Sequence, residues 1–207
     1  SVFAQAGAQV DEATQMVCLD PELVEASVAL APAEFEIAAR NASRSITLGG
    51  NHINFNLVGG PSFVSDLDGG RRTPTHEDFR NFMRLAHSLN VLHLGGSAPV
   101  APMDLPAPSR HLDMYYGAIT LHDKVWSANL LGTSRARDAL EMAAIVHGVP
   151  LERLVDRPVL ISNINTNSPR QLDASMSDGL TEMVTHGQPV TVTPFTLLGA
   201  MAPVTIA

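Results

Sequence analysis

From residue 91 onward, short apolar segments alternate with longer stretches whose apolar residues recur at helical spacing. The short segments cover 91–95, 124–131, 158–164 and 189–193, and each begins about 33 residues after the previous one. They lack strict polar alternation, which is typical of parallel strands covered by helices. An earlier segment, 54–64, is a further strand or a strand pair broken at Gly59, Gly60 and Pro61. The pattern therefore predicts five parallel strands.

Four helices are expected after the first four of these strands. The first begins at Thr73-Pro74 or at Thr75, and the fourth begins at a capping box over 168–171 and ends near Gly187. The second begins near residue 108. The expected apolar positions are Phe79, Phe82, Met83, Ala86 and Leu89 in the first helix, Leu112, Tyr115, Tyr116 and Ile119 in the second, and Ala136, Ala139, Leu140 and Ala143 in the third.

A strand followed by a helix is the repeat of the (β/α)8 TIM barrel, an α/β fold that closes with eight units and about 250 residues. The 207 residues hold about five units, so we expect part of a barrel over 51–207, with its C-terminal units missing. Residues 1–50 are expected to form a small α+β cap, with a helix capped by Asp20 and a hairpin within 34–48. An open barrel exposes strand edges, so we expect a homo-oligomer.

The composition indicates which kinds of molecule the chain is expected to bind. The formal net charge is −8, and hydrophobic residues make up 45% of the chain. This acidity argues against nonspecific binding to a phosphate backbone, and the sequence has no apolar run long enough to span a membrane. The single cysteine, Cys18, fits a reducing compartment. We therefore expect a cytoplasmic protein with no nucleic-acid or membrane partner.

Barrel enzymes take their reactive residues from the carboxyl ends of the strands. The segment from Asp66 to Arg72 is the densest in charge, with Asp66, Asp68, Arg71 and Arg72 around two glycines. Its carboxylates could hold a cationic ligand or position a proton. Alternatively, the segment is a turn whose Asp side chains bind backbone amides and pair with the arginines.

Asn163, Asn165 and Asn167 alternate near the end of the fourth strand, so all three side chains face the same way if the strand extends through them. They are either hydrogen-bonding groups for a ligand or residues that organise a turn. The sequence has no GxSxG or HExxH motif, and we expect no metal site. A Schiff-base lyase or aldolase is the least favoured class, because Lys124 lies at the start of a strand.

Three stretches, 66–75, 157–169 and 187–205, resemble the trimethylamine methyltransferase family. The resemblance covers essentially the whole chain and implies an eight-stranded α/β barrel. It also implies transfer of a methyl group from a quaternary amine or trimethylamine to the cobalt of a corrinoid (cobalamin) that a partner protein carries. The chain itself would bind no cofactor, and this portion alone would be inactive. Family members that act on trimethylamine carry pyrrolysine on a later strand, so residues 1–207 leave the amine open.

The resemblance, together with the need to hold a cation, suggests roles for particular residues. Asp66 and Asp68 are the expected catalytic residues. The expected substrate-binding residues are Arg71, Arg72, Tyr115, Trp126, Asn163, Asn165 and Phe195. Trp126 has an alternative role as a filler of the core. The alternative function is that of a noncatalytic amine-binding or assembly relative with the same barrel.

Overall fold

The structure is a computed structural model that describes residues 1–96, 98–167 and 171–194. The chain divides into two compact units, one of residues 1–35 with 49–51 and one of residues 36–48 with 52–207. Each unit is described by itself.

The first unit contains a short helix, a hairpin and a longer helix. Helix α1 (Val2–Gln5) precedes the antiparallel strands β1 (Gln9–Asp11) and β2 (Met16–Cys18), which the sequence pattern did not predict. Helix α2 (Pro21–Ala29) begins as predicted, because the Asp20 side chain accepts a hydrogen bond of 2.9 Å from the Glu22 amide and Pro21 occupies the first helical position. None of residues 1–35 is buried.

Strands β3 (Glu34–Ile37) and β4 (Ile46–Gly49) form a two-stranded sheet around the short 3₁₀ helix η1 (Ala42–Arg44). This confirms the hairpin predicted within 34–48. Ile37 and Ile46, one on each strand, are buried.

The main sheet is parallel and has the order β7 (Ser127–Asn129), β8 (Ile161–Asn165) and β9 (Val190–Thr193). Isolated parallel bridges, Asn56 with Leu94 and Leu94 with Val125, continue the same order to the two earlier segments. The predicted parallel arrangement is therefore confirmed for the last three strands, whereas the two earlier segments are joined to them only by these two bridges, both of which involve Leu94. The closed barrel stays a prediction.

Two predicted strands are wrong in their extent, and one of them, 91–95, contains only the bridge residue Leu94. Residues 54–64 do not form a continuous parallel strand, since Val64 begins β5 (Val64–Asp66), which pairs antiparallel with β6 (Gly70–Arg72). The loop between them has three residues, and Gly70 has a φ of 61°. A three-residue loop followed by a glycine in the left-handed region is a common hairpin geometry. The charged segment is thus a hairpin and not the loop after a parallel strand.

Four long helices follow the strands: α3 (His76–Ser88), α4 (Arg110–Leu121), α5 (Thr133–His147) and α6 (Ala174–Thr185). A 3₁₀ helix, η2 (Leu151–Asp156), follows α5. Helix α3 has the capping box of Thr75 and Asp78, so the second of its two predicted starts is confirmed. Helix α6 begins at Ala174, capped by Asp173, and not within 168–171 as predicted; Gln171 forms a bridge with Asn167, and residues 168–170 lie outside the described residues.

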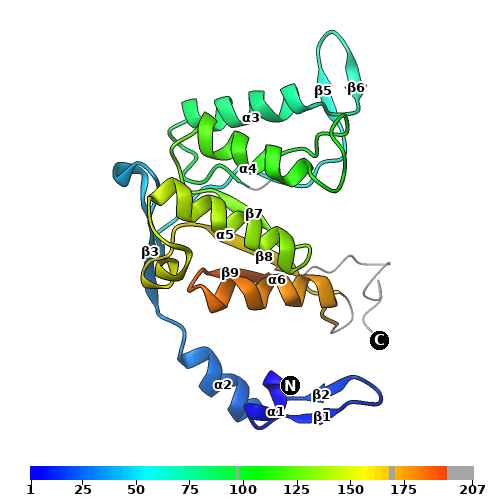
Figure 1. The fold of residues 1–207 in the computed structure, drawn as a ribbon, viewed down its shortest axis with the longest axis vertical. Coiled ribbons are helices and arrows are strands. Elements are labelled where there is room, and N and C mark those ends of the chain that lie inside the picture. Colours follow the sequence, from blue (N-terminus) through cyan, green and yellow to red (C-terminus); the bar gives the residue numbers. More distant parts are fainter. Residues whose placement is uncertain (97, 168–170, 195–207) are drawn as a thin grey trace. The chain divides into compact units, whose positions relative to one another are not determined.

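The core is formed mainly by helix faces and the sheet (Figure 1). The predicted face of α5 is buried, but α4 has a different phase from the one expected, with Leu112 and Tyr116 exposed. The cause is a close approach between helices, because a Cβ on Gly117 would come within 2.8 Å of the Phe79 ring. Leu89, expected on the buried face of α3, follows the end of that helix and is exposed.

Candidate functional site

The two faces of the β7–β8–β9 sheet differ in chemistry. On one face Ala128 and Ile164 belong to the hydrophobic core formed with α5 and α6. The parallel register places Asn129 beside Asn163, Asn163 beside Thr191, and Asn165 beside Thr193. Paired residues of adjacent strands share a face, and this second face points away from the core. We call it the polar sheet face, and its residues are Asn129, Asn163, Asn165, Thr191 and Thr193.

Hydrogen bonds connect three side chains of the polar sheet face. The Thr193 hydroxyl donates to Asn163 Oδ1 at 2.5 Å, and Asn163 Nδ2 donates to Asn165 Oδ1 at 3.2 Å. Asn163 and Asn165 are exposed. None of the described residues on this face of the three strands is ionisable. The face can therefore donate and accept hydrogen bonds without carrying a formal charge.

The main chain of Asn129 is held from behind by Tyr115. The Tyr115 hydroxyl accepts a hydrogen bond of 2.9 Å from the Asn129 amide and lies 3.3 Å from the Asn129 carbonyl oxygen. Burial raises the pKa of Tyr115 to about 12, so the phenol keeps its proton at neutral pH. Tyr115 is 1% exposed and its ring lies 5.4 Å from that of Trp126, which is also buried. Both side chains belong to the core, which for Trp126 matches the core-filling alternative.

The hairpin β5–β6 brings together the predicted catalytic carboxylates and the arginines. Asp66 accepts hydrogen bonds from the amides of Asp68 and Gly69, at 3.1 and 2.5 Å, and from Arg72 Nε at 3.1 Å. The Gly69 amide and the Arg72 guanidinium hold the pKa of Asp66 below its ordinary value. Asp68 is exposed, and Arg71 lies 3.9 Å from the centre of the Phe63 ring. The geometry favours the turn interpretation for Asp66.

Arg72 also joins the hairpin to helix α3. Its guanidinium donates to both carboxylate oxygens of Asp78, at 2.6 and 2.7 Å. These hydrogen bonds hold the pKa of Asp78 well below its usual range, and the same carboxylate completes the α3 capping box. A cavity of about 130 Å³ lies beside this network, between the hairpin and α3.

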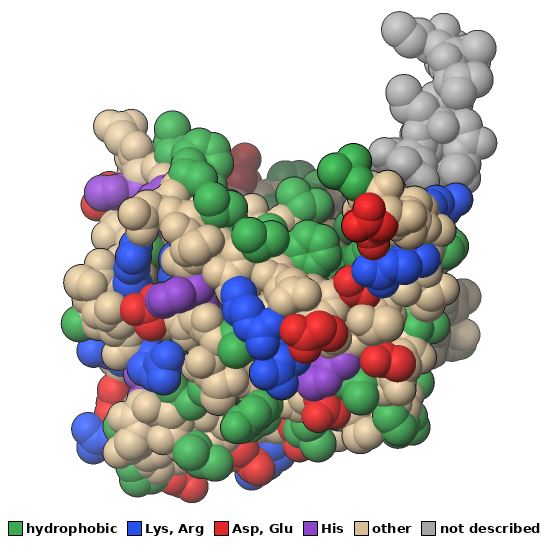
Figure 2. Space-filling view, turned by 90° about the horizontal axis from the view of Figure 1, so that it is seen from above, with side chains coloured by type: hydrophobic (Ala, Val, Ile, Leu, Met, Phe, Trp, Pro, Cys, Tyr) green, Lys and Arg blue, Asp and Glu red, His purple; other side chains and the backbone are tan. Residues whose placement is uncertain are grey.

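The predicted residues do not form one site. Figure 1 places the hairpin apart from the β7–β9 sheet, so Asp66, Asp68, Arg71 and Arg72 are separated from Asn163 and Asn165. The face seen from above in Figure 2 has acidic, basic and hydrophobic side chains interspersed, with no large patch of one charge sign on that face. Phe195 lies outside the described residues. The roles of all nine residues in catalysis or binding stay predictions.

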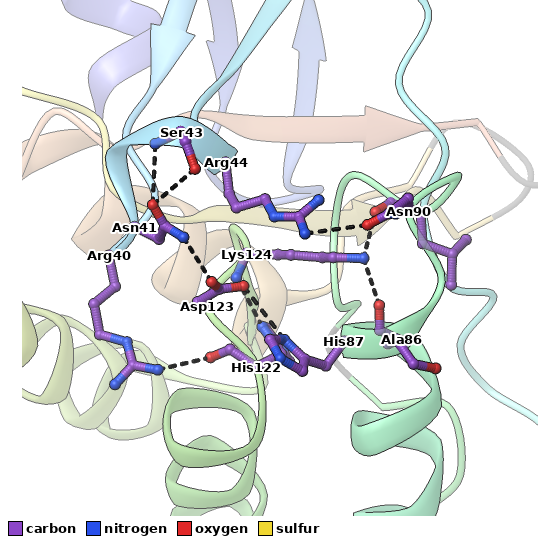
Figure 3. Close-up of polar contacts among 12 residues, drawn as sticks. Arg40, Asn41, Ser43, Arg44, Ala86, His87, Asn90, His122, Asp123 and Lys124 are labelled. Carbon is purple, nitrogen blue, oxygen red and sulfur yellow. Dashed lines mark hydrogen bonds and ion pairs between the residues drawn. The ribbon is translucent and has the colours of Figure 1, made fainter.

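Lys124 is the centre of a polar cluster at the start of the strand that leads to β7 (Figure 3). Its Nζ atom lies 2.5, 2.7 and 2.7 Å from the carbonyl oxygens of Ala86, Leu89 and Leu92. The ammonium group therefore uses all three donors, on carbonyls at the end of α3 and in the segment that follows it. A lysine held in this way is poorly suited to form a Schiff base, in agreement with the low rank of lyase chemistry.

The same cluster holds the 40–44 segment against residues 122–124. The Asn41 side chain donates to Asp123 Oδ2 at 2.7 Å, and Arg40 donates to the His122 carbonyl oxygen at 3.2 Å. His122 is 3% exposed, and its Nδ1 accepts from the Lys124 amide at 3.2 Å. Burial lowers the pKa of His122 to about 4, so its ring is neutral at neutral pH. Sequence reasoning missed this cluster. The position of Lys124, the sole lysine of the chain, beside apolar strand residues could have indicated it.

Across 1–96, 98–167 and 171–194, no group of three or more His, Cys, Asp or Glu side chains is placed to hold a metal ion. No helix in those ranges is long and apolar enough to cross a membrane.

Comparison with known proteins places the chain in a family. The family model described as trimethylamine methyltransferase (MTTB) matches residues 1–207. The chain is 35% identical over 206 residues to glycine betaine methyltransferase from Desulfitobacterium hafniense, covering all of this chain and 42% of that protein. It is 29% identical over 210 residues to trimethylamine methyltransferase MttB from another strain of that species, covering all of this chain and 41% of the relative. The chain spans about two fifths of the length of these relatives, and it belongs to the trimethylamine methyltransferase family.

Proposed function

We propose that this chain is part of a methyltransferase that moves a methyl group from a methylated amine to the cobalt of a corrinoid protein. Family membership and the names of the two relatives support transfer from a methylated amine. The location of the site is proposed from the polar sheet face, which is uncharged, at least partly exposed and borne on parallel strands. We further propose that the reaction takes place in the cytoplasm, with the chain in a homo-oligomer.

The position of this face suits a barrel active site. Asn165 and Thr193 are the last residues of β8 and β9, and barrel enzymes bind substrates at the carboxyl ends of their strands. Asn163 lies two residues earlier on the same face. The hydrophobic core directly behind these strands fixes their backbone, so the amide groups project from a rigid support.

Methyl transfer from a quaternary amine requires the protein mainly to bind and orient the substrate. When its carrier protein is docked, the corrinoid would supply the Co(I) nucleophile that takes the methyl carbon as the C–N bond breaks and nitrogen keeps the bonding pair. A quaternary nitrogen leaves as a neutral amine, so no proton needs to be delivered to it. The residues of this chain would therefore align the substrate and exclude water. The amides of Asn163 and Asn165 are suited to this role because they donate and accept hydrogen bonds without a formal charge.

The test uses the full-length protein with its corrinoid partner reduced to Co(I). Trimethylamine and glycine betaine are supplied separately, methyl transfer is followed by the absorbance of the corrinoid, and the demethylated amine is identified by mass spectrometry. Asn163→Ala and Asn165→Ala are each expected to lower kcat/KM about tenfold, the equivalent of about 1.4 kcal/mol of transition-state stabilisation.

Thr185→Val is the matched control, because the Thr185 hydroxyl donates only within α6, to the Thr181 carbonyl oxygen at 2.7 Å. Unchanged kcat/KM in both Asn variants would remove the polar sheet face from the site. Amine binding without any methyl transfer would instead support the noncatalytic amine-binding alternative.

A further inference from the structure

Asn129 carries a third amide side chain of the polar sheet face and is the last residue of β7. The register of the sheet sets Asn129 beside Asn163 and Asn163 beside Thr191, so the three side chains form one row across three strands. Adjacent strands lie about 4.8 Å apart, so a small molecule that contacts Asn163 is also within reach of Asn129. Asn129 is partly exposed, and its amide can both donate and accept hydrogen bonds.

The main chain of Asn129 is bound by a side chain and not by a neighbouring strand. Its amide donates to the Tyr115 hydroxyl at 2.9 Å, and its carbonyl oxygen lies 3.3 Å from the same hydroxyl. In a parallel sheet the N–H and the C=O of one residue point to the same neighbouring strand. The earlier segment bridges this part of the chain at Val125, four residues before Asn129. Tyr115 of α4 therefore takes the place of that strand at the end of β7.

The main chain determines the direction of these hydrogen bonds. A backbone N–H can only donate, so the Tyr115 oxygen is the acceptor for Asn129. The single phenol proton is shared between two acceptors, the carbonyl oxygens of Asn129 and Arg135, at 3.3 and 3.4 Å. The Tyr115 side chain is 1% exposed, and its ring lies 5.4 Å from that of Trp126. The hydroxyl is thus held by the core, and it holds the end of β7 in turn.

We infer that Asn129 is a further residue that contacts the methylated amine, and that Tyr115 is the positioning residue that keeps Asn129 in place. Tyr115 is buried, so it acts on the substrate only through Asn129. This inference rests on the proposed function, because it assumes that the polar sheet face binds a methylated amine.

Two substitutions separate the side chain of Asn129 from its main-chain anchor. Asn129→Ala removes the amide side chain and keeps both main-chain contacts with Tyr115. Tyr115→Phe removes only the hydroxyl and keeps the ring in the core. Thr120→Val is the matched control, because it removes another hydroxyl from α4 that donates only within the helix, to the Tyr116 carbonyl oxygen at 2.7 Å.

Amide hydrogen exchange of the full-length protein, followed by mass spectrometry, tests the anchor without any substrate. Peptides that cover residues 127–131 should exchange faster in Tyr115→Phe, because the Asn129 amide has lost its acceptor. The same peptides should exchange at the unaltered rate in Thr120→Val. Equal exchange in Tyr115→Phe and the unaltered protein would overturn the positioning role of Tyr115.

Methyl transfer by the full-length protein with its corrinoid partner tests the contact with the amine. Asn129→Ala is expected to lower kcat/KM about tenfold, and Tyr115→Phe about fivefold. In the Asn129→Ala background, Tyr115→Phe should change kcat/KM by no more than about twofold, since the side chain that it positions is gone. In the Asn163→Ala background it should still lower kcat/KM about fivefold.

The outcomes distinguish the inference from the proposed function. If the unaltered protein transfers a methyl group from neither trimethylamine nor glycine betaine, the proposed function fails together with the inference. If it is active and Asn129→Ala is equally active, only the inference fails. A fivefold effect of Tyr115→Phe that persists without the Asn129 side chain would show that Tyr115 merely supports the sheet, and it would overturn the positioning role.

Discussion

Replacing Lys124 with methionine should destabilise the protein strongly, although Lys124 has no place in the proposed reaction. The side chain is 2% exposed, and its ammonium group is the shared partner of three carbonyls at the end of α3 and in the segment that follows it (Figure 3). Methionine has nearly the same length and is apolar, so Lys124→Met removes the donors with little change in packing.

The size of the effect follows from the burial of the three hydrogen bonds. The bond to the Ala86 carbonyl is buried, so its loss leaves an unsatisfied acceptor and costs about 1.5 to 3 kcal/mol. The bonds to Leu89 and Leu92 are partly buried, and water can replace the donor there at a cost of about 1 kcal/mol each. Burial lowers the pKa of Lys124, and removal of the buried charge offsets part of the loss. We expect the free energy of unfolding to fall by about 3 kcal/mol.

Urea denaturation of the full-length protein, followed by circular dichroism, measures this change. Arg153→Met is the matched control, because it removes an exposed cation whose partner, Asp156, lies at 2.6 Å on the same short helix and should contribute less than about 1 kcal/mol. A Lys124→Met protein as stable as the unaltered one would show that water or a shifted α3 end satisfies the carbonyls at no cost. It would refute the view that Lys124 fixes that helix end.

Three shorter predictions concern titration and the hairpin. The pKa of His122 is about 4 in the folded protein and 6.5 in the unfolded chain, so the unfolded state binds more protons between these values. The free energy of unfolding should therefore fall by about 3 kcal/mol as the pH drops from 6.5 to 4. Urea titrations of His122→Asn should show no such dependence on pH. Arg72→Met, which leaves Asp78 unpaired, should cost about 1 to 2 kcal/mol in thermal unfolding, and Arg72→Lys should recover only part of it, whereas full recovery would show that the two-pronged contact is unimportant. Asp66→Asn should leave methyl transfer within about threefold, because the Asp66 oxygens are already bound within the hairpin, and a tenfold loss at unchanged stability would restore Asp66 as a catalytic residue.

The elements that could be predicted were those specified by neighbouring residues. Asp20 before Pro21, and Thr75 three residues before Asp78, are local capping signals, and both helices begin where the signals indicate. The parallel direction of the last three strands was also predictable, because the apolar pattern repeats with each strand and helix. The phase of α4 was not predictable in this way, since it depends on Gly117 meeting Phe79 of another helix.

The β5–β6 hairpin could have been predicted from its turn residues, but the expected barrel architecture led to a different prediction. Asp68, Gly69 and Gly70 are turn residues, and their spacing is typical of a short hairpin. The expectation that charged segments follow parallel barrel strands placed them at the mouth of the first strand instead. The structure pairs Asp66 with Gly70 across a tight turn, and the energetic reason is local: the Asp66 carboxylate binds two amides of that same turn.

In the candidate site, the common face of Asn163 and Asn165 could be predicted from the sequence, but the position of Thr193 could not. Alternation along one strand places Asn163, Asn165 and Asn167 on a common face. The structure keeps the first two there, whereas Asn167 lies beyond the end of β8 and forms a bridge with Gln171. Alternation cannot specify which residue of the next strand lies beside them, because the register of parallel strands depends on the packing of the helices between them. Thr193 enters the site only through that register, which sets it beside Asn165 and within 2.5 Å of Asn163. The contact between Thr193 and Asn163 is therefore a tertiary property, and substitutions that shift α6 against the sheet should disturb it even where the polar side chains are unchanged.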